Sequence, residues 1–255
     1  MNGGRSVGFE PRVALASLSG RSDAVWAEAS AEHVGAAFLG GIALDEETRN
    51  AAREMVRRDR EEFLPVDPIA FVDEQLAEFE ETSLKAGFNL RSATLEPVRE
   101  VAAVCRERGA ICEINAHCRQ EEMCAAGTGE ALLRDPDRLD AQVRAAAGAE
   151  ALVSVKVRAE VEGVDLVYIT RRISAAGASI VHVDAMDSKR VVAEIAESGD
   201  LFVIANNGVR DEHAVREYLS YGADAVSVGR ASDKPRVLQR VRRATDAWFA
   251  EEVPA

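Results

Sequence analysis

The sequence predicts a single (β/α)8 TIM barrel of the α/β class, and three observations support this prediction. Short apolar runs alternate with amphipathic stretches along all 255 residues, as expected for parallel strands joined by helical crossovers. A chain of this length also matches the size of one such barrel. No Pro-, Gly- or Ser-rich linker divides it, so we expect one domain over residues 1–255, with the barrel core at about 11–245.

The candidate strands are nearly continuous apolar runs, which suit a parallel sheet covered by helices. In chain order they are Arg12–Ser17, Ala36–Leu39, Ala86–Leu90, Ala110–Ile114, Leu152–Val157, Ser179–Val183, Leu201–Ala205 and Asp224–Val228. Eight repeats favour a closed barrel. An open doubly wound sheet is the alternative, but the turn after its first strand usually carries GxGxxG, and here that turn reads SLSGRSD.

Amphipathic stretches between the strands predict the helices. Leu95–Arg108, Pro136–Ala147 and Asp211–Tyr221 are three of them, and the last opens with the acidic turn that helix starts prefer. Asp45–Arg60 and Asp67–Lys85 are both helical in pattern. We therefore expect an extra helix in the second crossover.

Composition limits the function classes. The net charge of −13 disfavours general affinity for nucleic acid, because an acidic surface repels phosphate backbones. No apolar run approaches the roughly 20 residues that span a bilayer, and the first residues hold no apolar signal core. Four cysteines in a chain this long are not a disulfide framework. These features predict a cytoplasmic protein with reduced thiols and no membrane partner.

Polar residues stand at the ends of most candidate strands, where this fold carries its chemistry. They are Ser17, Asn89, Asn115, Cys118, Lys156, Arg158, His182, Asp184, Asn206, Asn207, Gly208, Gly229 and Arg230. Any one of them alone has an even chance of being a rim or core polar group. Together they favour a polar ligand at the mouth of the barrel.

The strongest local signal is the pair of turns ANNG (Ala205–Gly208) and VGRASD (Val228–Asp233). Glycine lets the backbone approach a ligand closely, and a helix start adds positive potential. Arg230 can pair with a phosphate oxygen through its planar fork. The sequence therefore predicts a phosphate site after strands seven and eight. The alternative is two ordinary turns with an incidental arginine.

Two polar residues lie inside apolar strands, and each has two possible bonding partners. Lys156, in VSVKVR, is costly to bury unpaired, so it meets either a ligand or a carboxylate such as Glu113 or Asp184. His182, in IVHVD, bonds either a ligand or a neighbouring carbonyl.

The segment EINAHCRQEEMCAAGTG (Glu113–Gly129) runs from a strand end into a polar, glycine-bearing loop. Cys118 stands where a thiol can face a substrate and donate a proton. Cys124 is its competitor in the same loop. A metal site built from Cys112, His117 and these two thiols is disfavoured, since no compact CxxC pair exists. We expect no stable metal.

The order of these motifs resembles the tRNA-dihydrouridine synthase family, in its short archaeal-type branch. The family has an acid–hydrophobe–Asn–x–Gly–Cys–Pro motif, here EINAHCR, and then a glycine-bearing loop, here AAGTGEALLRDP. The strand-five Lys-x-Arg resembles SVKVR, and the later motifs resemble His182, IANNG and Gly229–Arg230. His117 and Arg119 stand where the family has Gly and Pro, and strand seven carries an extra Asn.

The resemblance implies bound FMN, whose hydride reduces C6 of a uracil ring while Cys118 supplies the proton to C5. Asn115 and Arg158 are then expected to bind substrate. The residues expected to contact the flavin are Asn89, Lys156, His182, Asn206, Gly208, Gly229 and Arg230, the last four around the phosphate. NAD(P)H or another reductant supplies the electrons. Members active on tRNA carry a C-terminal helical RNA-binding domain, and we expect none in this protein.

Three hypotheses follow. The first is an FMN-dependent reductase of uridine in tRNA. The second is a flavin oxidoreductase acting on a free pyrimidine or another small molecule, which suits the acidic surface. The third is a non-redox barrel that binds phosphate.

Overall fold

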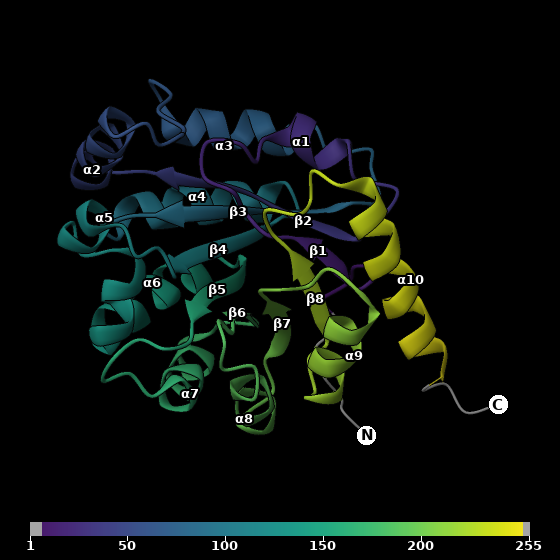
Figure 1. Cartoon of the computed structure of the whole chain (residues 1–255). Coiled ribbons are helices and arrows are strands. Elements are labelled where there is room, and N and C mark those ends of the chain that lie inside the picture. Colours follow the sequence, from purple (N-terminus) through teal and green to yellow (C-terminus); the bar gives the residue numbers. More distant parts are fainter. Residues whose placement is uncertain (1–6, 252–255) are drawn as a thin grey trace.

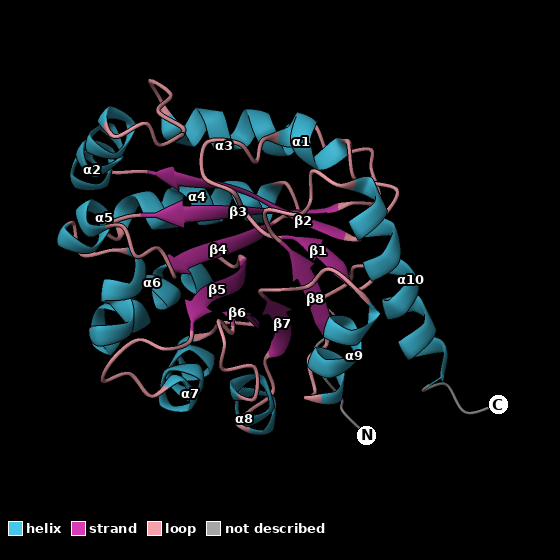
Figure 2. Ribbon diagram, viewed as in Figure 1, coloured by secondary structure: helices cyan, strands magenta, loops and turns pink. Residues whose placement is uncertain are grey.

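A computed structural model of the chain describes residues 7–251. Eight parallel strands close into a barrel in chain order, and helices surround it, as Figures 1 and 2 show. The strands are β1 Val13–Leu15, β2 Ala36–Ala43, β3 Lys85–Arg91, β4 Ile111–Ala116, β5 Leu152–Arg158, β6 Ile180–Asp184, β7 Phe202–Asn206 and β8 Ala225–Val228. Pairing of β1 with β8 completes the ring. The predicted closed barrel is confirmed, and the open-sheet alternative is wrong.

The helices occupy the crossovers between successive strands, and the last one follows β8. They are α1 Ala24–Glu28, α2 Glu46–Arg57, α3 Pro68–Ala77, α4 Glu96–Glu107, α5 Glu121–Ala125, the 3-10 helix η1 Gly129–Arg134, α6 Pro136–Gly148, α7 Leu166–Ala176, α8 Val191–Glu197, α9 Glu212–Ser220 and α10 Pro235–Glu251. Two of them, α2 and α3, share the second crossover, which confirms the extra helix. In residues 7–251 no helix combines the length and apolarity needed to cross a bilayer.

The segment after β4 differs from its prediction as a loop. It contains α5 and then enters η1 at Gly129. Glu121 and Glu122 lie in the first turn of α5, where negative charge favours a helix start.

Aspartate side chains begin many of the helices. The N-caps of six helices are Asp23, Asp45, Asp67, Asp135, Asp165 and Asp211, and each side chain accepts a backbone N–H of the first turn. Such caps each stabilise a helix by about 1 kcal/mol. Part of the acidic excess therefore has a structural role in the crossovers.

The inside of the barrel is layered. Apolar side chains, among them Phe38, Ile111, Ile180 and Phe202, pack together in its lower part. The Phe38 ring lies against His182, with 5.1 Å between the ring centroids. Above this apolar plug the inward side chains are polar, and they continue to the carboxyl ends of the strands. The fold therefore presents its polar interior at the mouth.

Candidate active site

Glu113 of β4 is the centre of a hydrogen-bonded network inside the barrel. Its Oε1 accepts from Nδ2 of Asn89 at 2.8 Å, and its Oε2 accepts from the Ser154 hydroxyl at 3.1 Å. Nδ1 of His182 lies 2.8 Å from the same Oε2, and Nε2 of His182 lies 2.7 Å from Oγ of Ser227. All five side chains are fully buried. Because these groups pair with one another, the network forms a fixed floor beneath the mouth.

The charges of this floor follow from burial and neighbours. Burial alone would raise the pKa of Glu113, but His182, Lys156 and the Asn89 amide outweigh it and hold that pKa below its usual value. Burial lowers the pKa of His182 despite the attraction of Glu113. The network therefore pairs a carboxylate with a neutral imidazole.

Lys156 lies above this floor and has few partners. Its side chain is 3% exposed, and its one hydrogen bond among the described residues goes to Oγ of Ser17, at 3.4 Å. No carboxylate oxygen of residues 7–251 lies within 4.0 Å of its Nζ, so the ion-pair alternative is wrong. Burial lowers the pKa of Lys156, against the opposing influence of Glu113 and Asp184. A nearly buried amine with one weak bond is suited to a ligand acceptor.

Asn115 shapes the start of the segment after β4. Its Nδ2 donates to Oδ1 of Asn89 at 2.8 Å, which ties it to the network. Its Oδ1 accepts the backbone N–H groups of His117, at 3.1 Å, and Cys118, at 2.8 Å. Asn115 thus bends the chain around its own side chain and fixes the Cys118 backbone at the mouth.

The two loop thiols have different surroundings. Cys118 is half-buried, and a Cβ at Gly129 would meet its carbonyl oxygen at 2.2 Å, so only glycine fits there. Gly129 also has φ of +65°, which glycine tolerates best. Sγ of Cys124 lies 3.6 Å from the Cys118 carbonyl oxygen. Burial raises the pKa of Cys124, with further contributions from Glu130 and Cys118.

His117 and Asp184 form a short hydrogen-bonded contact. Nε2 of His117 lies 2.6 Å from Oδ2 of Asp184. Asp184 pairs in register with Arg158 of β5, so both lie at the same level of the barrel. Arg158 is nearly buried, with a Nη1 to Glu130 Oε2 distance of 3.7 Å, and its Nε has no partner in the described chain.

The turns after β7 and β8 carry the predicted phosphate residues. Asn206 is buried at the end of β7, whereas Gly208 and Arg230 are exposed. Nothing lies within 4 Å of a Cβ built on Gly208 or on Gly229. Oγ of Ser232 is buried and has no partner within residues 7–251. Open backbone, a spare hydroxyl and an available guanidinium therefore lie along this part of the chain.

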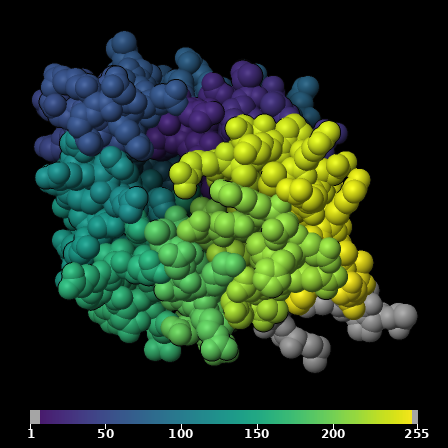
Figure 3. Space-filling view, in the orientation of Figure 1, coloured from purple at the N-terminus to yellow at the C-terminus, as the bar shows by residue number. Residues whose placement is uncertain are grey.

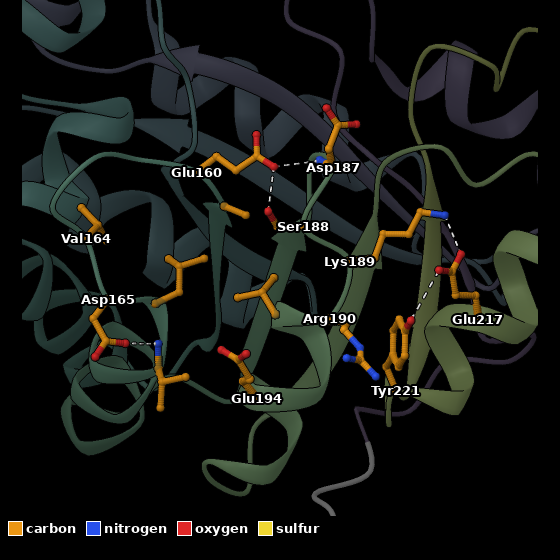
Figure 4. A pocket seen from close by; sticks show the side chains of 14 residues that line it. Glu160, Val164, Asp165, Asp187, Ser188, Lys189, Arg190, Glu194, Glu217 and Tyr221 are labelled. Atoms are coloured by element: carbon orange, nitrogen blue, oxygen red, sulfur yellow. Dashed lines mark hydrogen bonds and ion pairs between the residues drawn. The ribbon is translucent and has the colours of Figure 1, made fainter.

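A separate cavity of about 660 Å³ lies between the segments that follow β5 and β6 and helix α9 (Figure 4). None of the predicted site residues lines it. Its polar groups pair internally: Nζ of Lys189 lies 2.5 Å from Glu217, and Glu160 accepts from Ser188 at 2.8 Å. The mouth, where segments from early, middle and late parts of the chain meet on one face (Figure 3), remains the candidate active site.

Comparison with known proteins identifies the family. The model of the family described as "Dihydrouridine synthase (Dus)" matches residues 48–255, which is most of the chain. The chain belongs to the dihydrouridine synthase family. A relative in Methanocaldococcus jannaschii, an uncharacterized protein, is 25% identical over 245 residues, covering 90% of this chain and 92% of its own.

Solved structures of other proteins have the same fold as this dihydrouridine synthase family member. FabK from Thermotoga maritima has a TM-score of 0.59 and 15% identity, over 88% of this chain and 59% of that one. A point mutant of FabK has a TM-score of 0.57 and 15% identity, over 89% of this chain and 63% of that one. This chain thus spans about 60% of the length of those structures, at an identity that shows the fold alone.

Dihydrouridine synthases use FMN, and this chain is an FMN-dependent oxidoreductase. The residues at the mouth fit that group. The turns after β7 and β8 have the buried Ser232 hydroxyl, which has no partner within residues 7–251, and open space over Gly208 and Gly229. Lys156 offers a donor that has no carboxylate partner in the described part of the chain. A bound anion would satisfy groups that the protein leaves spare.

Sequence reasoning placed most of these residues but missed two groups. The first is Glu113 as the centre of the network, although an acid inside the apolar run AICEI was a visible signal. The second is Arg91 at the end of β3, which is 1% exposed and pairs with Glu62 at 2.7 Å. Nothing in the local pattern of Glu62 indicated this pairing, because the connection between α2 and α3 brings it there.

Proposed function

We propose that this protein reduces the C5=C6 bond of a uracil ring, with uridine in tRNA as the substrate and NAD(P)H or another reductant as the electron source. The observation that carries the proposal is Lys156, a nearly buried amine at the mouth of an FMN-dependent barrel, with no carboxylate partner among residues 7–251. A half-buried thiol, Cys118, follows the adjacent strand, whose Asn115 pairs in register with Lys156. A ring with carbonyl acceptors would satisfy this arrangement.

The proposed roles follow the geometry. When bound, FMN supplies the hydride that adds to C6. Cys118 donates its proton to C5, so that one hydride and one proton saturate the double bond. Asn115 holds the backbone of the thiol, and Arg158 binds the substrate.

The remaining residues hold the cofactor. Lys156 contacts the flavin ring, and Asn206, Gly208, Gly229 and Arg230 surround the phosphate. Asn89 and His182 were also expected to contact the flavin. Both side chains are fully buried and bonded within the network around Glu113, so we assign them to the floor beneath the cofactor.

A free pyrimidine is the second candidate substrate, and the net charge of −13 favours it. RNA carries one phosphate per nucleotide and is repelled by an acidic surface. The four cysteines are free thiols, which supports a reducing cytoplasm for either reaction.

The test begins with FMN. Purified protein should bind FMN and become yellow, and unmodified tRNA incubated with it and NADPH should gain dihydrouridine, measured by mass spectrometry of nucleosides. Uracil and uridine monophosphate are assayed in parallel, with Cys118→Ala as the inactive control. Reduction of the free pyrimidine alone would select the second candidate. Protein that stays colourless and binds no FMN would contradict both flavin-dependent candidates. The third hypothesis, a non-redox barrel that binds phosphate, would then remain.

A further inference from the structure

His117 is held in place through both its backbone and its side chain. Its backbone N–H donates to Oδ1 of Asn115 at 3.1 Å, and its Nε2 lies 2.6 Å from Oδ2 of Asp184. The other oxygen of Asp184 accepts from the Met186 backbone at 3.2 Å, so the carboxylate is itself held in place. The imidazole therefore has a defined orientation at the mouth.

The ring nitrogens of His117 have different roles. An ionised carboxylate only accepts hydrogen bonds. Nε2 is therefore the protonated ring nitrogen, and it donates a hydrogen bond to Asp184. Burial lowers the pKa of His117, and Lys156 and Arg158 add to this, which together outweigh the attraction of Asp184. Burial opposes ionisation of Asp184, but its contacts with His117 and the Met186 backbone outweigh burial and lower its pKa to about 2. With Nε2 donating to this carboxylate and the pKa of the ring lowered, Nδ1 is the nitrogen that keeps a lone pair.

Nδ1 of His117 is unpaired among the described residues, and two cationic side chains are close enough to influence the imidazole. These cationic groups belong to Lys156 and Arg158. Nε of Arg158 is buried without a partner in that part of the chain. The mouth therefore combines spare donors with one spare acceptor. An imide edge, C=O–NH–C=O, has the complementary pattern, whereas a cytosine ring has an acceptor in place of the N–H.

We infer that His117 is a specificity-determining residue whose Nδ1, oriented by Asp184, accepts the imide N–H of a uracil-type ring. The inference deepens the proposed function and rests on it for the identity of the ring. Two rings have this edge: the pyrimidine of the substrate and the flavin itself. The position of His117 next to Cys118 favours the substrate.

Two pairs of probes test this inference, each pair differing at one ring N–H. On FMN-loaded protein, 1-methyluracil is compared with 1,3-dimethyluracil by the change in flavin absorbance. On protein freed of FMN, FMN is compared with 3-methyl-FMN by fluorescence titration. The variants are His117→Ala and Asp184→Asn. The matched control is His213→Ala, since His213 is exposed on α9.

Wild type and His213→Ala should prefer the N–H form of one pair by about tenfold, the effect of one hydrogen bond at a buried site. His117→Ala should lose that preference, and Asp184→Asn should weaken it. If His117→Ala loses the preference only in the uracil pair, His117 accepts the N–H of the substrate. If it loses the preference only in the flavin pair, His117 accepts the N–H of the flavin. The inference fails if wild type shows neither preference or if His117→Ala retains it. The tRNA assay is separate, so failure of the proposed function is recognised independently.

Discussion

Oε2 of Glu113 lies 2.8 Å from Nδ1 of His182, a contact that reaches from β4 to β6 inside the barrel. The same carboxylate binds Asn89 of β3 and Ser154 of β5. One side chain therefore joins four consecutive strands from within. Removing it would leave an imidazole, an amide and a hydroxyl buried without an acceptor, and buried groups of this kind are costly when unpaired.

Glu113→Ala should therefore destabilise the protein strongly. We expect the free energy of unfolding to fall by on the order of 3 kcal/mol, since breaking a buried network costs more than a surface change. Urea denaturation followed by circular dichroism measures this. Glu100→Ala, at an exposed position of α4, is the control and should change the midpoint little. Equal stability of the two variants would contradict the assigned role of Glu113.

This network also shows how much of the fold and of the site can be predicted from the sequence. Nearly continuous apolar runs between amphipathic stretches predicted the eight strands, because local pattern decides which segments are strands. Strand ends predicted Asn89, Lys156 and His182 as inward groups. Their partners depend on barrel closure: Ser227 of β8 meets His182 of β6 only in the closed barrel. Long connections likewise determine the Arg91–Glu62 pair, which no local pattern encodes.

Stability should decrease as the pH falls from about 7 to 5. Burial lowers the pKa values of His117 and His182 in the folded protein. Below the unfolded value near 6.5 the unfolded chain binds more protons than the folded one, so acid favours unfolding. Each histidine contributes a slope of at most about 1.4 kcal/mol per pH unit. Urea midpoints across this range measure it. His117→Gln should have a shallower slope than wild type.

Lys156→Met should separate structure from function. The wild-type amine is nearly buried, and no carboxylate of the described residues pairs with it, so its removal eliminates a desolvation cost and should leave the melting temperature equal or higher. FMN affinity should fall about tenfold, from the loss of one donor. Thermal denaturation and fluorescence titration give the two readouts. An unfolded variant would show instead that Lys156 supports the fold.

Arg230→Ala should weaken FMN binding by removing a charge-assisted contact to the phosphate. Arg230 is exposed, so we expect a loss of about tenfold, at the lower end for such bonds. Riboflavin, which lacks the phosphate, should bind wild type and variant equally. Arg144→Ala, on the exposed side of α6, is the control. Unchanged FMN affinity in Arg230→Ala would place the phosphate elsewhere.

Cys118→Ala should retain FMN and lose turnover. The thiol follows β4, and its backbone N–H is held by Oδ1 of Asn115 at 2.8 Å, whereas the cofactor residues lie on other strands. Loss of a positioned acid typically costs about 10²–10⁴ in rate. Cys124 is the matched comparison, because its Sγ contacts the Cys118 carbonyl and its raised pKa reflects burial first. We expect Cys124→Ala to lower turnover only modestly, through a looser loop. Flavin reduction by NADPH and ring reduction are measured separately for both variants. A fully active Cys118→Ala beside an inactive Cys124→Ala would assign proton transfer to Cys124.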